Sequence, residues 1–224
     1  MPYLKTIACL ANSRKLSGRC VAGKEISATG QLGAWVRPVS SRPKQELSPI
    51  ERRYANGTEP RLLDRIEVSL QSHVPHEYQV ENHLIDPTVR WVKTGTITWH
   101  DLDTAVDAIN GTLWIDRHSS YNGLNDRIPH VQAQPLPSSL KIIELEGLIV
   151  AVALEGINPK RTARAHFSLG GVNYALTVTD PVAAALYLAQ GTGEYPIGAA
   201  RLCISIGEPY DGYCYKLVAG IITP

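Results

Sequence analysis

The residue types best suited to binding chemistry in this sequence are the lysines, arginines and tryptophan near the N-terminus. Basic side chains surround the turn predicted between the first two strands: Arg14, Lys15, Arg19 and Lys24. Trp35 and Arg37 stand two apart on the third predicted strand, so they share one face. A guanidinium beside an indole offers hydrogen bonds to phosphate next to a surface on which a base can stack. The alternative is that Trp35 is a core residue and Arg37 forms a structural ion pair at the rim.

A second aromatic group lies near the C-terminus. Tyr213 and Tyr215 share one face of a predicted strand, with Tyr210 before them and Lys216 beside them. We expect Tyr213, Tyr215 and Lys216 to contact the same kind of ligand. Tyrosine is also common in β-proteins as a core residue with its hydroxyl at the rim, and a structural role is the alternative.

Three histidines give the strongest indication of a metal site: His73, His76 and His83. The first two are three residues apart, so they do not share one face of a strand, and Pro75 disfavours a regular helix. A metal would therefore need a loop that folds them together, with Glu77 or Glu81 as a further ligand. We predict polar loop residues here, no metal site and no cofactor.

Catalytic signatures are weak throughout the sequence. Possible acid, base and nucleophile types occur in three short runs: His100-Asp101, His118-Ser119 and His166-Phe167-Ser168. None of them has the setting of a known nucleophile motif such as G-x-S-x-G. The glycine pairs lack the Lys-Ser or Lys-Thr that follows in a phosphate-binding loop. We therefore predict no catalytic residues.

The net charge of +1 hides an uneven distribution along the 224 residues. Residues 1–65 carry twelve Lys/Arg against five Asp/Glu, whereas residues 66–224 carry ten against sixteen. Such an asymmetry favours a phosphate-rich ligand for the first segment, with a solvated surface as the alternative. A second small basic patch, Lys160–Arg164, is expected to be solvated surface.

The compartment is predicted from the cysteines and the apolar runs. The four cysteines form no CxxC pair, which favours buried free thiols in a reducing environment. The N-terminal apolar run is too short for a signal peptide, and no run approaches the roughly 20 apolar residues of a membrane span. We expect a cytoplasmic protein without membrane contact.

Short strands separated by turn residues dominate the chain, so the fold class is mainly β. In the first half, strands are predicted over 3–10, 19–26, 33–39 and 62–70, with helices over 48–54 and 98–108. In the second half, strands are predicted over 139–144, 148–154, 162–169, 172–178, 200–206 and 213–222, with a helix over 182–190. Residues 121–137 read as a linker between a first domain, 1–120, and a second, 138–224. The pattern predicts two consecutive small barrels with about one short helix each, and a single sandwich is the alternative.

Several motifs resemble those of a known family. They are Lys15–Lys24, Trp35–Ser40 and Leu62–Asp64 near the start, and Val178–Pro181, Ser205–Tyr210 and Tyr213–Ala219 near the end. Together they resemble the dual-OB-containing domain. This resemblance implies two OB-like barrels that bind nucleic acid or nucleotides in prokaryotic conflict and defence systems. It supplies no catalytic residues.

Three functions compete at this stage. The favoured one is binding of nucleic acid or a nucleotide, with single-stranded nucleic acid preferred, in a prokaryotic defence system. The first alternative is a protein-interaction or sensor subunit that positions a separately encoded effector protein. The second alternative is an enzyme that acts on a nucleotide or a modified base.

Overall fold

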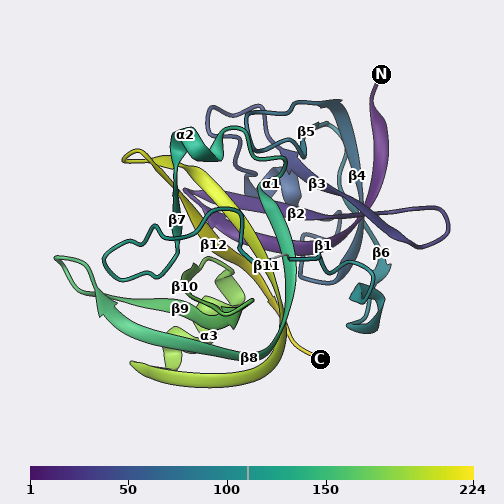
Figure 1. Ribbon diagram of the computed structural model, residues 1–224. Helices are drawn as coiled ribbons and strands as arrows, with labels where there is room; N and C mark the ends of the chain where they lie inside the picture. The colour runs from purple at the N-terminus through teal and green to yellow at the C-terminus, as the bar shows by residue number, and fades with distance from the viewer. Residues whose placement is uncertain (110) are drawn as a thin grey trace. The chain divides into compact units, whose positions relative to one another are not determined.

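The computed structural model describes residues 1–109 and 111–224 (Figure 1). The chain forms two compact units, Met1–Ala105 and Val106–Pro224, which we call the first and the second unit.

The first unit contains six strands: β1 (Tyr3–Lys15), β2 (Gly18–Ile26), β3 (Leu32–Val39), β4 (Asp64–His73), β5 (Asn82–Ile85) and β6 (Val92–Thr96). Five of them form a ring in the order β1-β2-β3-β5-β4, which closes where β4 pairs with β1. The β3–β5 pair is parallel and the other pairs are antiparallel. A short helix, α1 (Pro49–Arg52), lies between β3 and β4, and a 3-10 turn, η1 (His100–Leu102), follows β6.

The second unit contains six strands: β7 (Arg127–Pro129), β8 (Leu140–Glu155), β9 (Lys160–Leu169), β10 (Val172–Val178), β11 (Gly193–Tyr210) and β12 (Tyr213–Ile222). The ring order is β8-β9-β10-β12-β11, and β11 pairs with β8 to close it. The β10–β12 pair is parallel, and α3 (Pro181–Gln190) lies between β10 and β11. Another short helix, α2 (His130–Ala133), follows β7.

The two rings therefore have the same topology. In chain order, the first strand pairs with the second and the fourth, the third pairs with the fifth in parallel, and a helix precedes the fourth. The expectation of a mainly β chain with two consecutive small barrels and short helices is confirmed.

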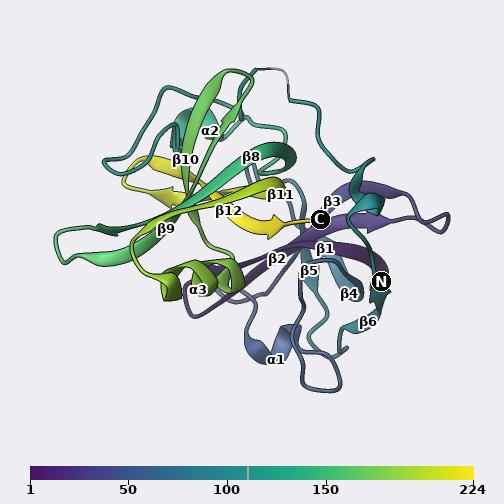
Figure 2. The ribbon, with the colours of Figure 1, turned by 90° about the horizontal axis from the view of Figure 1, so that it is seen from below.

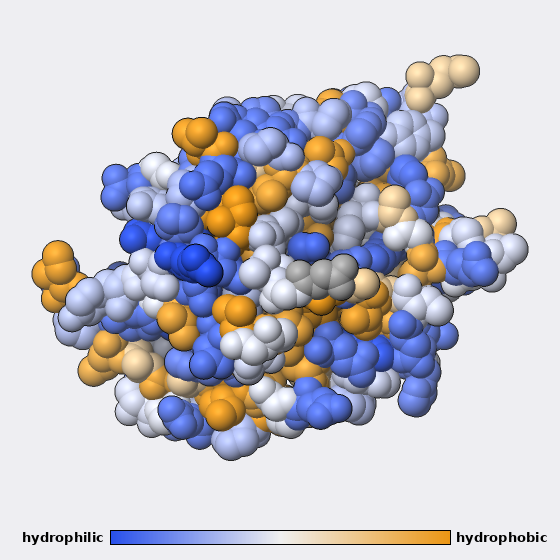
Figure 3. Space-filling model, in the orientation of Figure 1, coloured by the Kyte–Doolittle hydropathy of each residue, from blue (hydrophilic) through white to orange (hydrophobic). Residues whose placement is uncertain are grey.

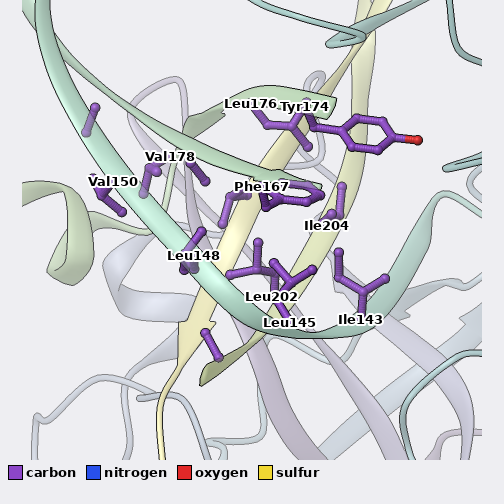
Figure 4. Close-up of a cluster of buried hydrophobic side chains, with 14 of the residues drawn as sticks. Ile143, Leu145, Leu148, Val150, Phe167, Tyr174, Leu176, Val178, Leu202 and Ile204 are labelled. Atoms are coloured by element: carbon purple, nitrogen blue, oxygen red, sulfur yellow. The ribbon is translucent and has the colours of Figure 1, made fainter. Parts of the chain in front are cut away.

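Alternating side chains build each core. In β9, Ala163, Ala165 and Phe167 are buried in the core, whereas His166 and Ser168 are exposed. Figure 4 shows the core of the second unit, where apolar side chains of neighbouring strands point toward one another and the Tyr174 hydroxyl points away. The core of the first unit is built in the same way from Ile7, Cys9, Val21, Val36, Leu47, Tyr54, Ile66, Val68, Leu70, Ile85 and Trp91.

The predicted helix starts are confirmed by hydrogen bonds. The Ser48 hydroxyl accepts from the Glu51 backbone N–H at 3.3 Å, and the Glu51 carboxylate accepts from the Ser48 N–H at 2.7 Å. This capping box satisfies two backbone donors that the first turn leaves open. At α3, the Asp180 carboxylate accepts from the N–H groups of Val182 and Ala183.

Two segments differ from their predictions. Only His100–Leu102 is helical in the region 98–108, as a single 3-10 turn, and Leu102 and the following Ala105 are buried. The segment 121–137, predicted as a linker, contains β7 and α2. β7 forms a ladder with β12, so its backbone groups are satisfied by a partner far away in the sequence.

Candidate nucleic-acid interface

The basic residues at the first turn lie on the hairpin of β1 and β2. Arg14 stands opposite Arg19, and Lys15 stands opposite Gly18. Arg14 is exposed, while Lys15 and Arg19 are half-buried. The predicted neighbourhood of Arg14, Lys15 and Arg19 is therefore present.

Lys24 belongs to a different group. It lies five residues after Arg19 on β2, so the two side chains point to opposite faces of the strand. Lys24 instead stands opposite Trp35 of β3, and its Nζ lies 5.4 Å from the centre of the indole ring. This geometry is a cation–π contact between neighbouring strands.

Arg37 shares the outer face of β3 with Trp35, as predicted, but its guanidinium is held by other protein groups. One Nη lies 3.1 Å from a carboxylate oxygen of Glu81, and the other donates to the Asn82 side chain at 3.5 Å. The side chains of Arg37 and Glu81 are only 4% and 2% exposed. Arg37 is therefore part of a buried ion pair, which was the alternative interpretation of this residue.

Lys216 is the one predicted ligand contact that lies inside a barrel. Its side chain is fully buried, and its Nζ lies 2.5 Å from a carboxylate oxygen of Asp116. The Tyr174 hydroxyl donates to the other oxygen of Asp116 at 2.6 Å. Burial lowers the pKa of Lys216, and the Asp116 carboxylate opposes that shift. Lys216 thus points away from Tyr213 and Tyr215 and has a structural role.

Tyr213 and Tyr215 lie on the outer face of β12, and a third tyrosine joins them. Tyr210, at the end of β11, stands directly opposite Tyr213, so its side chain is on the same face. The two-residue turn between them, Asp211-Gly212, has positive φ at both positions, 49° and 76°. Asp-Gly is the pair that favours such a hairpin turn. Tyr210 is 74% exposed.

An arginine completes this surface. Arg127 of β7 stands opposite Tyr215, and its guanidinium carbon lies 4.0 Å from the centre of the Tyr213 ring. The His118 ring lies 6.4 Å from the same tyrosine ring, and the Arg127 backbone N–H donates to the His118 carbonyl. We call Tyr210, Tyr213, Tyr215, Arg127 and His118 the tyrosine face.

The Arg127 guanidinium has hydrogen-bonding capacity to spare. Its Nε is buried and has no hydrogen-bond partner. The nearest acid in sequence, Asp126, is already engaged by the Ser120 hydroxyl and N–H and lies 3.5 Å from an Arg164 Nη. Among the described residues, no carboxylate forms an ion pair with Arg127. The tyrosine face thus combines exposed aromatic surface with a cation that can accept an anionic partner.

Sequence reasoning missed Arg127 and His118 because both lie outside the predicted strands. Arg127 sits in the segment that was predicted as a linker, and His118 comes from the loop before it. Their place beside Tyr213 follows from the pairing of β7 with β12, a contact between residues more than eighty positions apart. The only local indication of a site in this segment was Arg127 itself, a single arginine among polar turn residues.

The predicted histidine group is partly assembled. The rings of His73 and His83 lie 4.7 Å apart, and the Tyr3 hydroxyl is 2.6 Å from His83 Nδ1. Burial, followed by the nearby His73 and Lys5, lowers the pKa of His83 to about 4. His76 lies in a separate turn, where its backbone pairs with Gln79. The described part of the chain contains no group of three or more His, Cys, Asp or Glu residues placed to hold a metal ion.

Asp101, an acid of one of the possible catalytic runs, has a local structural role. The Asp101 carboxylate accepts hydrogen bonds from the backbone N–H and the hydroxyl of Thr98, at 2.7 and 2.8 Å. These bonds lower the pKa of Asp101. The carboxylate therefore stabilises the start of η1.

Comparison with known proteins gives one match. The family model described as a dual OB-containing domain covers residues 5–221, nearly the whole chain. No curated protein and no solved structure matches the sequence. Among the described residues, no helix is both long and apolar enough to cross a bilayer.

Proposed function

The chain belongs to the dual OB-containing domain family, and on that premise we propose that it binds single-stranded nucleic acid through the tyrosine face of its second unit. OB barrels commonly bind oligonucleotides. The family alone does not select a surface. The choice of the tyrosine face depends on the contacts of its side chains.

The observation that carries the proposal is the stacking of Arg127 on Tyr213 without a carboxylate partner. A guanidinium in a structural role is ordinarily satisfied by carboxylates or carbonyls, as Arg37 is by Glu81. The guanidinium carbon of Arg127 lies 4.0 Å from the centre of the Tyr213 ring, and no carboxylate among the described residues forms an ion pair with it. A phosphate oxygen is an acceptor that its terminal N–H groups would bind with charge-assisted hydrogen bonds.

The tyrosines supply the second half of the interaction. Bases of a single strand stack on aromatic side chains, and each stacked base contributes roughly 1–3 kcal/mol. Tyr210 is largely exposed and Tyr213 and Tyr215 are half-buried, so their rings keep accessible surface. A duplex hides the faces of its bases, which is why this arrangement favours unpaired nucleotides.

The first unit contributes electrostatically in this proposal. Arg14 is exposed at the β1–β2 turn, near Lys15 and Arg19, whereas Lys24 is buried and forms its cation–π pair with Trp35 on the opposite face of β2. The residues at the turn attract a polyanion, and base stacking is assigned to the tyrosine face. A phosphate-rich strand is drawn to such charges over a distance of about 10 Å at moderate salt.

The proposal is tested with a binding panel that separates ligand classes. Labelled single-stranded DNA, single-stranded RNA, duplex DNA and a cyclic nucleotide are titrated with the full chain at low and high salt. We expect tight binding of a single strand that weakens steeply with salt, since each phosphate contact releases counterions. Absence of binding, or equal binding of duplex and single strand, would overturn the proposal.

The biological setting is also part of the proposal. The family resemblance implies a prokaryotic defence system, in which binding of foreign nucleic acid would be reported to a separately encoded effector. A host that relies on this protein should lose protection against phage when Arg127 is replaced by alanine. Full protection by Arg127→Ala at normal protein levels would contradict this role for the tyrosine face.

A second candidate function, a protein-interaction subunit, is favoured by α3. Its residues Pro181–Gln190 include no charged side chain, and Val182 and Leu186 are 76% and 57% exposed on adjacent turns. Exposed apolar surface of this kind marks interaction sites. If a partner binds there, Leu186→Glu should abolish its co-purification from the native host while nucleic-acid binding persists. Unchanged co-purification would exclude α3 as the contact.

A further inference from the structure

The hairpin that joins β8 and β9 extends past its neighbours. The last pair between β8 and β11 is Val152 with Gly193, and the last pair between β9 and β10 is Arg164 with Thr177. Beyond them, β8 and β9 continue to pair with each other up to Glu155 and Lys160. Residues 153–162 therefore form a two-stranded arm without flanking strands. Its tip stands clear of the second barrel in two perpendicular views (Figures 1 and 2).

The tip of this arm carries an isoleucine in full contact with solvent. Ile157 has a relative exposure of 102%, and Leu154 on the same arm is 61% exposed. In the space-filling view a hydrophobic group protrudes at the left edge, where the arm ends in Figure 1 (Figure 3). Ile157 contributes nothing to a core. Its neighbours in the turn are Gly156, Asn158 and Pro159, so it is the one apolar side chain of the turn with more than a ring or a hydrogen. Single exposed apolar side chains are common on protein surfaces, but here two of them, Ile157 and Leu154, stand on one protruding hairpin arm.

The two charges on the arm that have no ion-pair partner in the described part of the chain are both positive. Lys160 and Arg161 are exposed, and neither forms an ion pair among the described residues. The only carboxylate of the arm, Glu155, is held by Arg164 through two hydrogen bonds of 2.7 and 3.0 Å. Glu155 is therefore neutralised by a residue at the base of the arm. The tip of the arm therefore presents the apolar side chain of Ile157 beside two cations, Lys160 and Arg161, that form no ion pair with any described residue.

We propose that this arm grips nucleic acid and that Ile157 inserts between two adjacent bases. Aliphatic side chains serve as wedges between base steps, while neighbouring cations hold the backbone on either side. Lys160 and Arg161 contact the two phosphates that flank the opened step. This inference rests on the proposed function, because it adds a second contact to the same kind of ligand. It also goes beyond that function, since a wedge separates stacked bases whereas the tyrosine face accepts bases already separated.

The wedge is tested by the fluorescence of 2-aminopurine within a stacked single strand, because its emission rises when its neighbours move away. The full chain is mixed with oligodeoxyadenylate that carries this base at its centre. We expect emission to rise on binding, and Ile157→Ser to lose that rise and to bind about ten-fold more weakly. Ile50→Ser is the matched control, since Ile50 is 70% exposed on α1 of the first unit. It should behave as the wild type.

The flanking cations are tested by the salt dependence of the same complex. Each lost phosphate contact lowers the slope of log affinity against log salt by about 0.7 for a single strand. Lys160→Ala and Arg161→Ala should each produce a change of that size, and the double variant should produce twice as much. An unchanged slope in the double variant would overturn the assignment of the arm.

The outcomes separate this inference from the function on which it rests. If the strand binds but the emission rise survives Ile157→Ser, the wedge is wrong and the proposed function stands. If no nucleic acid binds at all, both are wrong. An apolar tip with cations also suits an anionic membrane, so the chain is mixed with vesicles of phosphatidylglycerol. Vesicle binding that depends on Ile157, without any 2-aminopurine response, would overturn the proposed ligand.

Discussion

The guanidinium of Arg127 lies over the ring of Tyr213, with its central carbon 4.0 Å from the ring centre and a buried Nε that no protein group satisfies. The two residues come from β7 and β12, which pair in register. The contact places a cation against the ring of Tyr213. With this contact the tyrosine face offers a cation for a phosphate next to aromatic rings for its base.

The Tyr213 ring should matter more than its hydroxyl. Tyr213→Ala removes a stacking surface and the support of Arg127, so affinity for a single strand should fall by about 1–3 kcal/mol. Tyr213→Phe keeps the ring and should bind nearly as well as the wild type. Fluorescence anisotropy measures both. Equal loss in the two variants would mean that the hydroxyl, rather than stacking, provides the interaction.

Asp211 should oppose binding of an anion. It is exposed in the turn between Tyr210 and Tyr213, and no cation pairs with it among the described residues. Asp211→Asn removes the charge, and asparagine tolerates the positive φ of 49° at this position. We expect affinity to rise about two- to five-fold at low salt, as for other exposed charge pairs. A fall in affinity would place the nucleic acid elsewhere.

Lys216 should be needed for stability and not for binding. Lys216→Met leaves the Asp116 carboxylate buried and unpaired, which should cost about 3–5 kcal/mol in the free energy of unfolding. Urea unfolding of the second unit measures this loss. The double variant Lys216→Met with Asp116→Asn should recover part of it, and both should bind as well as the wild type once folded. A binding defect in a fully folded Lys216 variant would contradict the structural assignment.

The stability of the first unit should depend on pH through His83. Its pKa is about 4 in the folded state because the ring is buried, against an ordinary value of 6.5. Between these values the unfolded chain binds the extra proton, so stability is level above pH 6.5 and falls as the pH is lowered to 4. Each unit of pKa difference corresponds to about 1.4 kcal/mol. In His83→Gln, thermal unfolding should show little loss of stability between pH 6.5 and pH 4. If the loss is the same as in the wild type, another group causes it.

Sequence patterns predicted the features that depend on near neighbours. Helices were predicted near the caps Ser48 and Asp180, because capping uses residues only two or three positions away. The strands β9 and β10 and the turn between them, Gly170-Gly171, follow from alternation and from two glycines with positive φ. These signals are contained within about ten residues of chain.

Features that depend on distant partners were not predicted. β5 and β7 are only four and three residues long, too short for alternation, and they form because β4 and β12 offer open edges. The basic excess of the first segment was treated as available charge. In the structure two of its arginines are paired, Arg52 with Glu59 and Arg37 with Glu81. A charge count along the chain cannot separate such paired cations from free ones.

The central claim is that Arg127 on the tyrosine face contacts phosphate, and the salt dependence of binding tests it most directly. Labelled oligothymidylate is titrated with wild type, Arg127→Ala and Lys44→Ala, an exposed lysine of the first unit that serves as the charge-matched control. Arg127→Ala should bind about ten-fold more weakly, with a salt slope smaller by about 0.7, while Lys44→Ala stays close to the wild type. Equal affinities and slopes for the two variants would contradict the account.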